Sequence, residues 1–126
     1  MYSHMMVGSN DLEKSKTFYD ALFTAIGGEP GRIDPKGRVH YVHNGASFLV
    51  TKPIDGDAAS VANGSTIGFA MESEEQADAW HAAGVKAGGT AIEDPPGLRQ
   101  MGDVKLYLAY LRDPDGHKLC ALKRVA

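Results

Sequence analysis

Cysteine is nearly missing from this chain: Cys120 is the single one among 126 residues. One cysteine cannot form a disulfide within the chain, so a disulfide-stapled scaffold is excluded and a reducing compartment is expected. The sequence also lacks an apolar run long enough to cross a bilayer, and its first residues lack the basic and apolar segments of a secretion signal. We therefore expect a cytoplasmic protein with no membrane partner.

An excess of positive charge is absent as well. The formal net charge is -3 and the sequence pI is about 5.9, with lysine and arginine scattered apart from the terminal pair Lys123-Arg124. A nucleic-acid surface would need a basic face, so no nucleic-acid partner is expected. Hydrophobic residues make up 43% and charged residues 23%, as in an ordinary folded domain, and the length suits one domain.

The first half of the chain has the pattern of a strand, a helix and three further extended runs. Asn10 and Glu13 form a capping box at the start of the predicted helix, and Gly27-Gly28 ends it. Asn44-Gly45 predicts a hairpin turn. The predicted strands are residues 3–7, 31–34, 39–43 and 47–51.

The second half repeats the order. Ser73 and Gln76 form a second capping box, and Gly88-Gly89 ends the second helix. The predicted strands are residues 66–71, 91–93, 106–112 and 118–123, with a loop over 94–104. This predicts an α+β domain of two tandem βαβββ modules, with module one at about 1–52, a linker at 53–63 and module two at 64–126. An ordinary α+β sandwich without an internal repeat is the alternative.

Three segments in order, covering essentially the whole chain, resemble one family. They are His4-Met5-Met6-Val7 with the helix start Asp11-Leu12-Glu13-Lys14-Ser15 and Phe18-Tyr19, then Gly64-Ser65-Thr66-Ile67-Gly68-Phe69, then Asp113-Pro114-Asp115-Gly116-His117-Lys118-Leu119. The chain resembles the vicinal oxygen chelate superfamily of glyoxalases, bleomycin-resistance proteins and extradiol dioxygenases. The resemblance implies curved mixed sheets that form a concave cup, with the helices outside. In many members the cup holds a divalent metal that chelates vicinal oxygens of a substrate.

The family's metal ligands imply four positions in this chain. A histidine on the first strand is matched by His4, but the second histidine is replaced by Thr66 and the final glutamate by Cys120. The position paired with Cys120 by internal alignment is Leu49, and a slip of register would bring Ser47 or Thr51 there instead. A catalytic divalent ion needs about three protein ligands, so we expect no cofactor and only an incomplete metal site around His4.

Strand alternation predicts which side chains line the cup. If His4 points inward, so do Met6, Gly68 and Leu49, which makes the cup mostly apolar with room for a small molecule. Arg99, in the loop 94–104, is expected on a lid that closes over the ligand. The expected ligand-binding residues are His4, Met6, Leu49, Thr66, Gly68, Arg99 and Cys120, whereas His40, His43, His81 and His117 are expected at the surface.

The function favoured by these features is binding of a small organic ligand in the cup, with a degenerate metal site. One alternative is a metal-dependent lyase of the glyoxalase type, or a dioxygenase, with ligands at other positions. Others are a non-catalytic protein that confers resistance by sequestering a drug, and, more remotely, an interaction scaffold. A homodimer is expected, because curved sheets leave edges that need covering.

Overall fold

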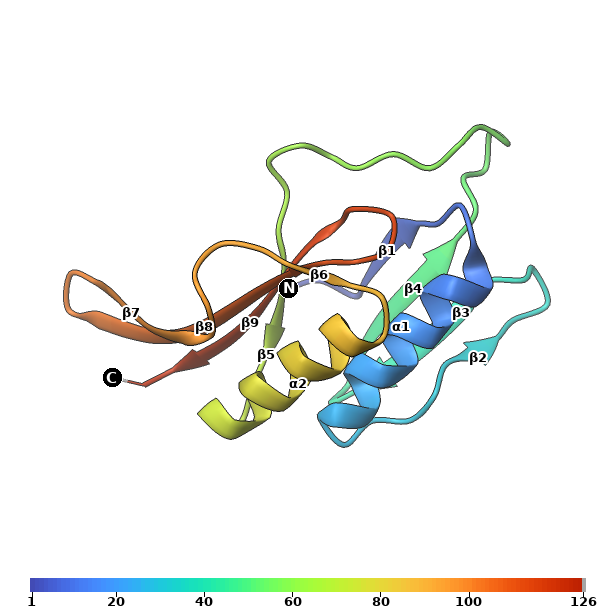
Figure 1. The fold of residues 1–126 in the computed structure, drawn as a ribbon. Coiled ribbons are helices and arrows are strands. Elements are labelled where there is room, and N and C mark those ends of the chain that lie inside the picture. The colour runs from blue at the N-terminus through green and yellow to red at the C-terminus, as the bar shows by residue number, and fades with distance from the viewer. Residues whose placement is uncertain (126) are drawn as a thin grey trace.

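The computed structural model describes residues 1–125 and confirms the α+β architecture of two similar modules (Figure 1). Module one contains β1, α1, β2, β3 and β4, and module two contains β5, α2, β6, β7, β8 and β9. The bounds are β1 (His4–Gly8), α1 (Leu12–Ala25), β2 (Arg32–Ile33), β3 (Val39–His43), β4 (Ala46–Thr51), β5 (Ile67–Ala70), α2 (Glu74–Lys86), β6 (Thr90–Ala91), β7 (Gly97–Met101), β8 (Val104–Arg112) and β9 (Lys118–Arg124).

Each module folds its strands into a sheet whose first strand lies at one edge and pairs in parallel with the last strand of the module. In module one the strand order is β1-β4-β3-β2, with β1 parallel to β4. In module two the order is β5-β9-β8-β6, with β5 parallel to β9. Met6 pairs with Leu49, and Gly68 pairs with Cys120. Leu49 and Cys120, which the internal alignment predicted to occupy equivalent positions in the two modules, therefore pair with residues that are themselves equivalent, Met6 and Gly68.

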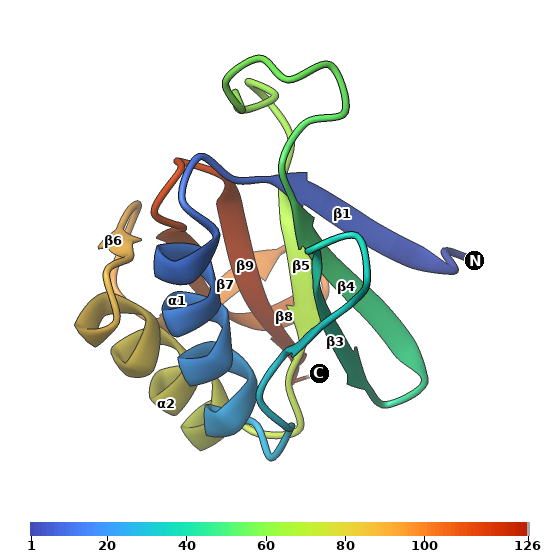
Figure 2. The same cartoon turned by 90° about the vertical axis from the view of Figure 1, so that its right-hand side faces the viewer.

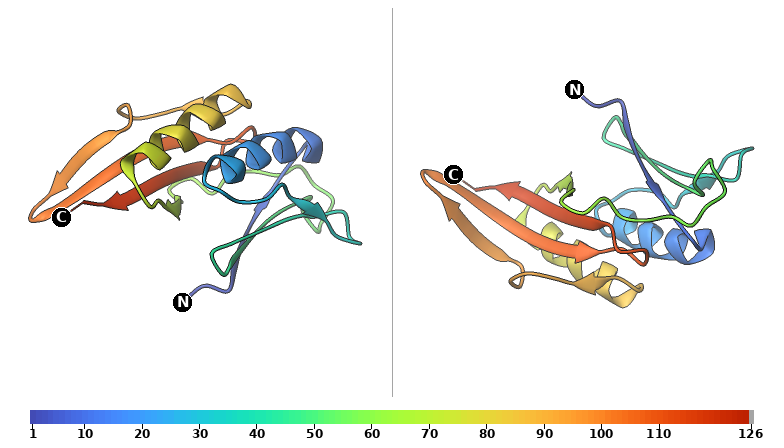
Figure 3. Two further views of the ribbon diagram at one scale, coloured as in Figure 1. Left: turned by 90° about the horizontal axis from the view of Figure 1, so that it is seen from below. Right: turned by 90° about the horizontal axis from the view of Figure 1, so that it is seen from above.

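Module two carries one strand more than the sequence pattern predicted. Residues 94–104, predicted as a loop, contain β7, which pairs antiparallel with β8 along its length. The turn at Gly102 has φ 61, which glycine adopts without strain. This segment is a hairpin arm and not a free lid loop (Figure 3).

The first helix begins one residue later than the capping box predicted. The N-cap is Asp11, whose carboxylate accepts a hydrogen bond from the Lys14 amide, and not Asn10. Asn10 instead bridges to the segment after β4, where its side chain bonds both the amide and the carbonyl of Ala59. The second cap is confirmed: Ser73 accepts from Gln76, and the Gln76 side chain accepts from the amide of Glu72.

The two modules meet mainly through α1 and α2, which lie side by side (Figure 2). Gly84 permits this approach, because a Cβ there would lie 2.4 Å from a Leu111 methyl and 3.0 Å from a Leu22 methyl. One continuous apolar core spans both modules and includes the fully buried Trp80. Phe69 joins it at the boundary, with its ring 5.9 Å from Phe23 and 5.6 Å from Phe48.

The hairpin between β8 and β9 also fastens the modules together. Tyr19 donates a 2.6 Å hydrogen bond to the Asp113 carboxylate, and the Asn10 amide donates one of 2.9 Å to Asp115. His117 lies 2.7 Å from the Gly8 carbonyl through Nε2. The prediction that His117 is a surface residue is wrong: it is 9% exposed, because the hairpin docks on the junction of β1 and α1.

Candidate functional site

Each sheet has one face packed on the helices and one face turned away from them. Val7, Val39 and Val50 belong to the core with the helices. The alternating neighbours point the other way, and we call these surfaces the open faces of module one and module two. Leu49 and Cys120 lie on the open faces, because neither belongs to the core that includes the helices. Both are nevertheless buried there, at 4% and 5% exposure.

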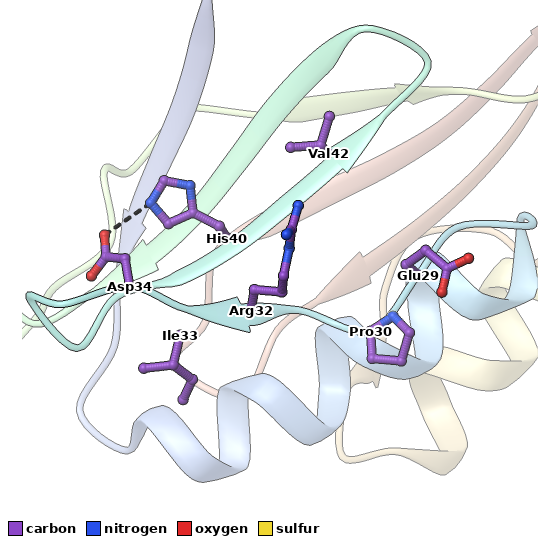
Figure 4. A pocket seen from close by; sticks show the side chains of 7 residues that line it. All are labelled: Glu29, Pro30, Arg32, Ile33, Asp34, His40 and Val42. Carbon is purple, nitrogen blue, oxygen red and sulfur yellow. Dashed lines mark hydrogen bonds and ion pairs between the residues drawn. The ribbon is translucent and has the colours of Figure 1, made fainter.

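On the open face of module one, four residues form a row across the sheet. Arg32 pairs with His40, His40 with Leu49, and Leu49 with Met6. Directly paired residues project from the same face, so the row runs from a cation through an imidazole to two apolar side chains. A cavity of about 590 Å³ lies at the polar end of this row (Figure 4).

Asp34 organises the polar end of the row. Its carboxylate accepts from the Arg38 guanidinium at 2.6 Å, from the Arg38 and Lys36 amides at 2.9 Å each, and lies 2.9 Å from His40 Nε2. Although partial burial acts to raise it, the pKa of Asp34 is held far below its usual range by these hydrogen bonds, those from Arg38 first. Asp34 is therefore a fixed anion that orients the His40 ring.

The open face of module two has a row of its own, in which Gly68 pairs with Cys120 and Cys120 with Tyr110. Burial raises the pKa of the Cys120 thiol, and this outweighs the opposing hydrogen bond with Tyr110 and the charges of Lys118 and Arg99. A raised pKa keeps the thiol protonated near neutral pH, so Cys120 is not an activated nucleophile. Nothing lies within 4 Å of a Cβ added at Gly68, which leaves the face open there.

Charged groups surround this second row. Lys118 forms an ion pair with Glu93, and its ammonium lies 4.9 Å from the centre of the Tyr110 ring. Arg99 lies on β7, where it pairs with Leu106, and its guanidinium donates to the carbonyls of Asp94 and Pro95 at 3.0 and 3.1 Å. Arg99 is thus engaged with its own hairpin arm.

The structure distributes the residues predicted from the sequence over the two faces. His4, Met6 and Leu49 lie in module one, where exposed His4 bonds Ser3 at 2.7 Å. Exposed Thr66, just before β5, lies in module two with the rest of the set, namely Gly68, Arg99 and Cys120. Sequence reasoning missed three polar residues of the first row or beside it: Arg32, Asp34 and His40. The alternation in Val39-His40-Tyr41 was a usable signal, since His40 must face away from its buried neighbours.

The residues at the family's metal positions do not fit a divalent ion. They offer one imidazole from His4, one buried thiol from Cys120, the hydroxyl of Thr66 and no donor from Leu49. Across residues 1–125, no three histidine, cysteine, aspartate or glutamate side chains are gathered in a way that could hold a metal ion. The neutral hydroxyl of Thr66 is a weak ligand, and the imidazole and the thiol alone fall short of the three protein ligands that catalytic sites use.

Comparison with known proteins identifies the class to which this fold and these faces belong. A model of the Glyoxalase/Bleomycin resistance protein/Dioxygenase superfamily matches residues 2–121. The chain belongs to this superfamily. None of its helices, within the residues described, is long and apolar enough to cross a membrane.

Solved structures agree with the family assignment. The chain is 54% identical to a glyoxalase/bleomycin resistance protein from Albidiferax ferrireducens T118, with a TM-score of 0.92 and 99% of both chains covered. A family enzyme from Burkholderia phytofirmans PsJN shares the fold at 15% identity, with a TM-score of 0.72 and 98% of both chains covered. The fosfomycin resistance protein FosX from Mesorhizobium loti does so at 15% identity and a TM-score of 0.66, over 98% of this chain and 91% of that one. No curated protein sequence matches significantly.

Proposed function

We propose that this protein binds a small organic ligand between open sheet faces and does so without a metal ion. The observation that supports this is the presence of Leu49, Thr66 and Cys120 at the positions of the family's ligands, with open space beside Cys120 at its strand partner Gly68. Apolar surface with a few polar groups suits a small amphipathic molecule. The alternative of a metal-dependent lyase or dioxygenase would need ligands that these positions do not supply.

A non-catalytic role, sequestration of a drug-like molecule, is the second candidate. It is favoured by the state of Cys120, the single cysteine of the chain, because burial raises the pKa of its thiol and it is therefore not an activated nucleophile. Binding without turnover of the same molecule would distinguish sequestration from catalysis.

Filling the open face of module two tests ligand binding. Gly68→Leu places a side chain in open space and is expected to weaken binding of anilinonaphthalene sulfonate, an amphipathic aromatic probe, about tenfold. Ala79→Leu adds the same side chain at an exposed position of α2 and should leave binding unchanged. Fluorescence titration measures both. Equal affinities for wild type and Gly68→Leu would refute binding at this face.

We further propose that two copies associate so that the open faces are covered. Met6 and Leu122 lie on these faces at 40% and 37% exposure, and a closed homodimer buries such surface most simply. Sedimentation velocity at micromolar concentration should report a dimer, and Met6→Glu should shift it toward monomer. A wild-type monomer under these conditions would contradict the proposal.

A further inference from the structure

The cavity at the polar end of the module one row is built by the β2 and β3 strands and the segment that follows α1. Its lining combines the guanidinium of Arg32 and the imidazole of His40 with two carboxylates and several apolar side chains (Figure 4). The lining residues are Glu29, Pro30, Arg32, Ile33, Asp34, His40 and Val42. Neither the family's metal positions nor the residues expected from the sequence include any of them.

His40 is held in one orientation and one tautomer at this cavity. The Asp34 carboxylate is a pure acceptor, so His40 Nε2, at 2.9 Å, carries the hydrogen and donates it. In the neutral ring Nδ1 is then a hydrogen-bond acceptor. Within residues 1–125, every buried side-chain nitrogen or oxygen has a hydrogen-bond partner. His40 Nδ1 has no hydrogen-bond partner in this part of the chain, so it is not buried and solvent reaches it.

Arg32 stands directly beside this imidazole. It is the cross-strand partner of His40, and such partners have Cβ atoms about 5 Å apart on the same face. Figure 4 shows both side chains extending from neighbouring strands, with Glu29 farther along the loop. Within the described chain, the Asp34 carboxylate forms an ion pair with Arg38 and a hydrogen bond with His40, and the exposed Arg32 guanidinium is left available.

We propose that Arg32 and His40 form a subsite for a small organic acid that carries a hydroxyl group next to its carboxylate. The planar guanidinium pairs with the carboxylate, and His40 Nδ1 accepts the hydrogen bond of the hydroxyl. The row continues into Leu49 and Met6, so the remainder of the ligand is apolar. This inference rests on the proposed function, because it assigns the ligand's polar end to one wall of the same cup.

A purely structural role explains only part of the arrangement. Asp34 and Arg38 close the turn between β2 and β3, since the Asp34 amide donates to the Arg38 carbonyl at 2.9 Å. That turn needs neither a guanidinium at Arg32 nor an accessible Nδ1 on His40. The two groups that the turn does not use are the two that would meet a ligand.

Three related compounds test the subsite: leucic acid, which has both groups, isocaproate, which lacks the hydroxyl, and isohexanol, which lacks the carboxylate. Nuclear magnetic resonance titration of the histidine ring nitrogens and methionine methyls should show leucate binding about tenfold tighter than either analogue. The His40 Nδ1 signal should move with leucate. Arg32→Gln should weaken leucate binding about tenfold, and His40→Phe should reduce it to the affinity of isocaproate.

Lys36→Gln is the matched control, because Lys36 is exposed on the neighbouring turn and carries the same charge without lining the cavity. It should leave leucate affinity unchanged. Equal binding of leucate and isohexanol, or equal losses in Arg32→Gln and Lys36→Gln, would overturn the subsite while leaving the proposed function intact. If none of the compounds moves the Met6 methyl signal and anilinonaphthalene sulfonate also fails to bind, the proposed function fails with it.

Discussion

Asp113→Ala is expected to lower the free energy of unfolding by about 3 kcal/mol, although Asp113 lies in the hairpin turn between β8 and β9. The substitution removes the acceptor of the Tyr19 hydroxyl, which is fully buried, and of the His117 amide. Burial, together with the Asp113 charge, raises the pKa of Tyr19 well above its usual value, so the hydroxyl stays protonated and must find an acceptor. Chemical denaturation measures the loss.

Two further variants show whether the network carries this effect. Tyr19→Phe removes the donor and should cost about 1 kcal/mol, and the double variant should cost less than the two losses added together. Asp103→Ala, at an exposed turn position between β7 and β8, should cost nothing measurable. Additive losses for Tyr19→Phe and Asp113→Ala would contradict the proposed coupling of the modules through this hydrogen bond.

Thr66→His combined with Cys120→Glu is expected to create a divalent metal site in a cup that we propose works without one. With His4 these changes restore two imidazoles and a carboxylate at family positions. Because even outer-shell partners are worth about 10- to 100-fold in metal affinity, two direct ligands should raise the affinity by more than about 100-fold. Manganese, nickel and zinc titrations by calorimetry measure the gain.

The restored site should also be visible in stability. A glutamate at the buried Cys120 position is unfavourable until an ion neutralises it, so the double variant should be destabilised alone and stabilised by metal. Adding His4→Ala should abolish both effects. Absence of metal binding in the double variant would mean that these three positions do not meet in the assembled cup.

Most of the fold follows from local chemistry in the sequence. The hairpin between β3 and β4 was predicted from Asn44-Gly45, and both residues have positive φ, 50 and 79. The strand β7 was missed because Pro95-Pro96-Gly97 and Gly102 resemble loop punctuation, and because Leu98 and Met101 are exposed and give no buried alternation. The β7 segment is a strand because its backbone hydrogen-bonds to β8, and this pairing is not visible in the local sequence pattern.

The candidate site was only partly predictable. The family positions His4, Leu49, Thr66 and Cys120 could be assigned by register. Leu49 and Cys120 each pair with the first strand of their own module, at Met6 and Gly68, which agrees with their assignment as equivalent positions. The role of His117 depends on the docking of a hairpin against β1, over 100 residues away in sequence. The orientation of His40 depends on Asp34 across a turn, which no local periodicity encodes.

Metal content tests the central claim, a cup that binds its ligand without a metal ion, most directly. Elemental analysis of untagged protein, purified without chelator or metal-affinity resin, should find far less than one divalent ion per chain, and His4→Ala should leave that value unchanged. The opposite result, one tightly held divalent ion per chain that His4→Ala removes, would contradict the account and direct the search for ligands to other residues or to a partner copy.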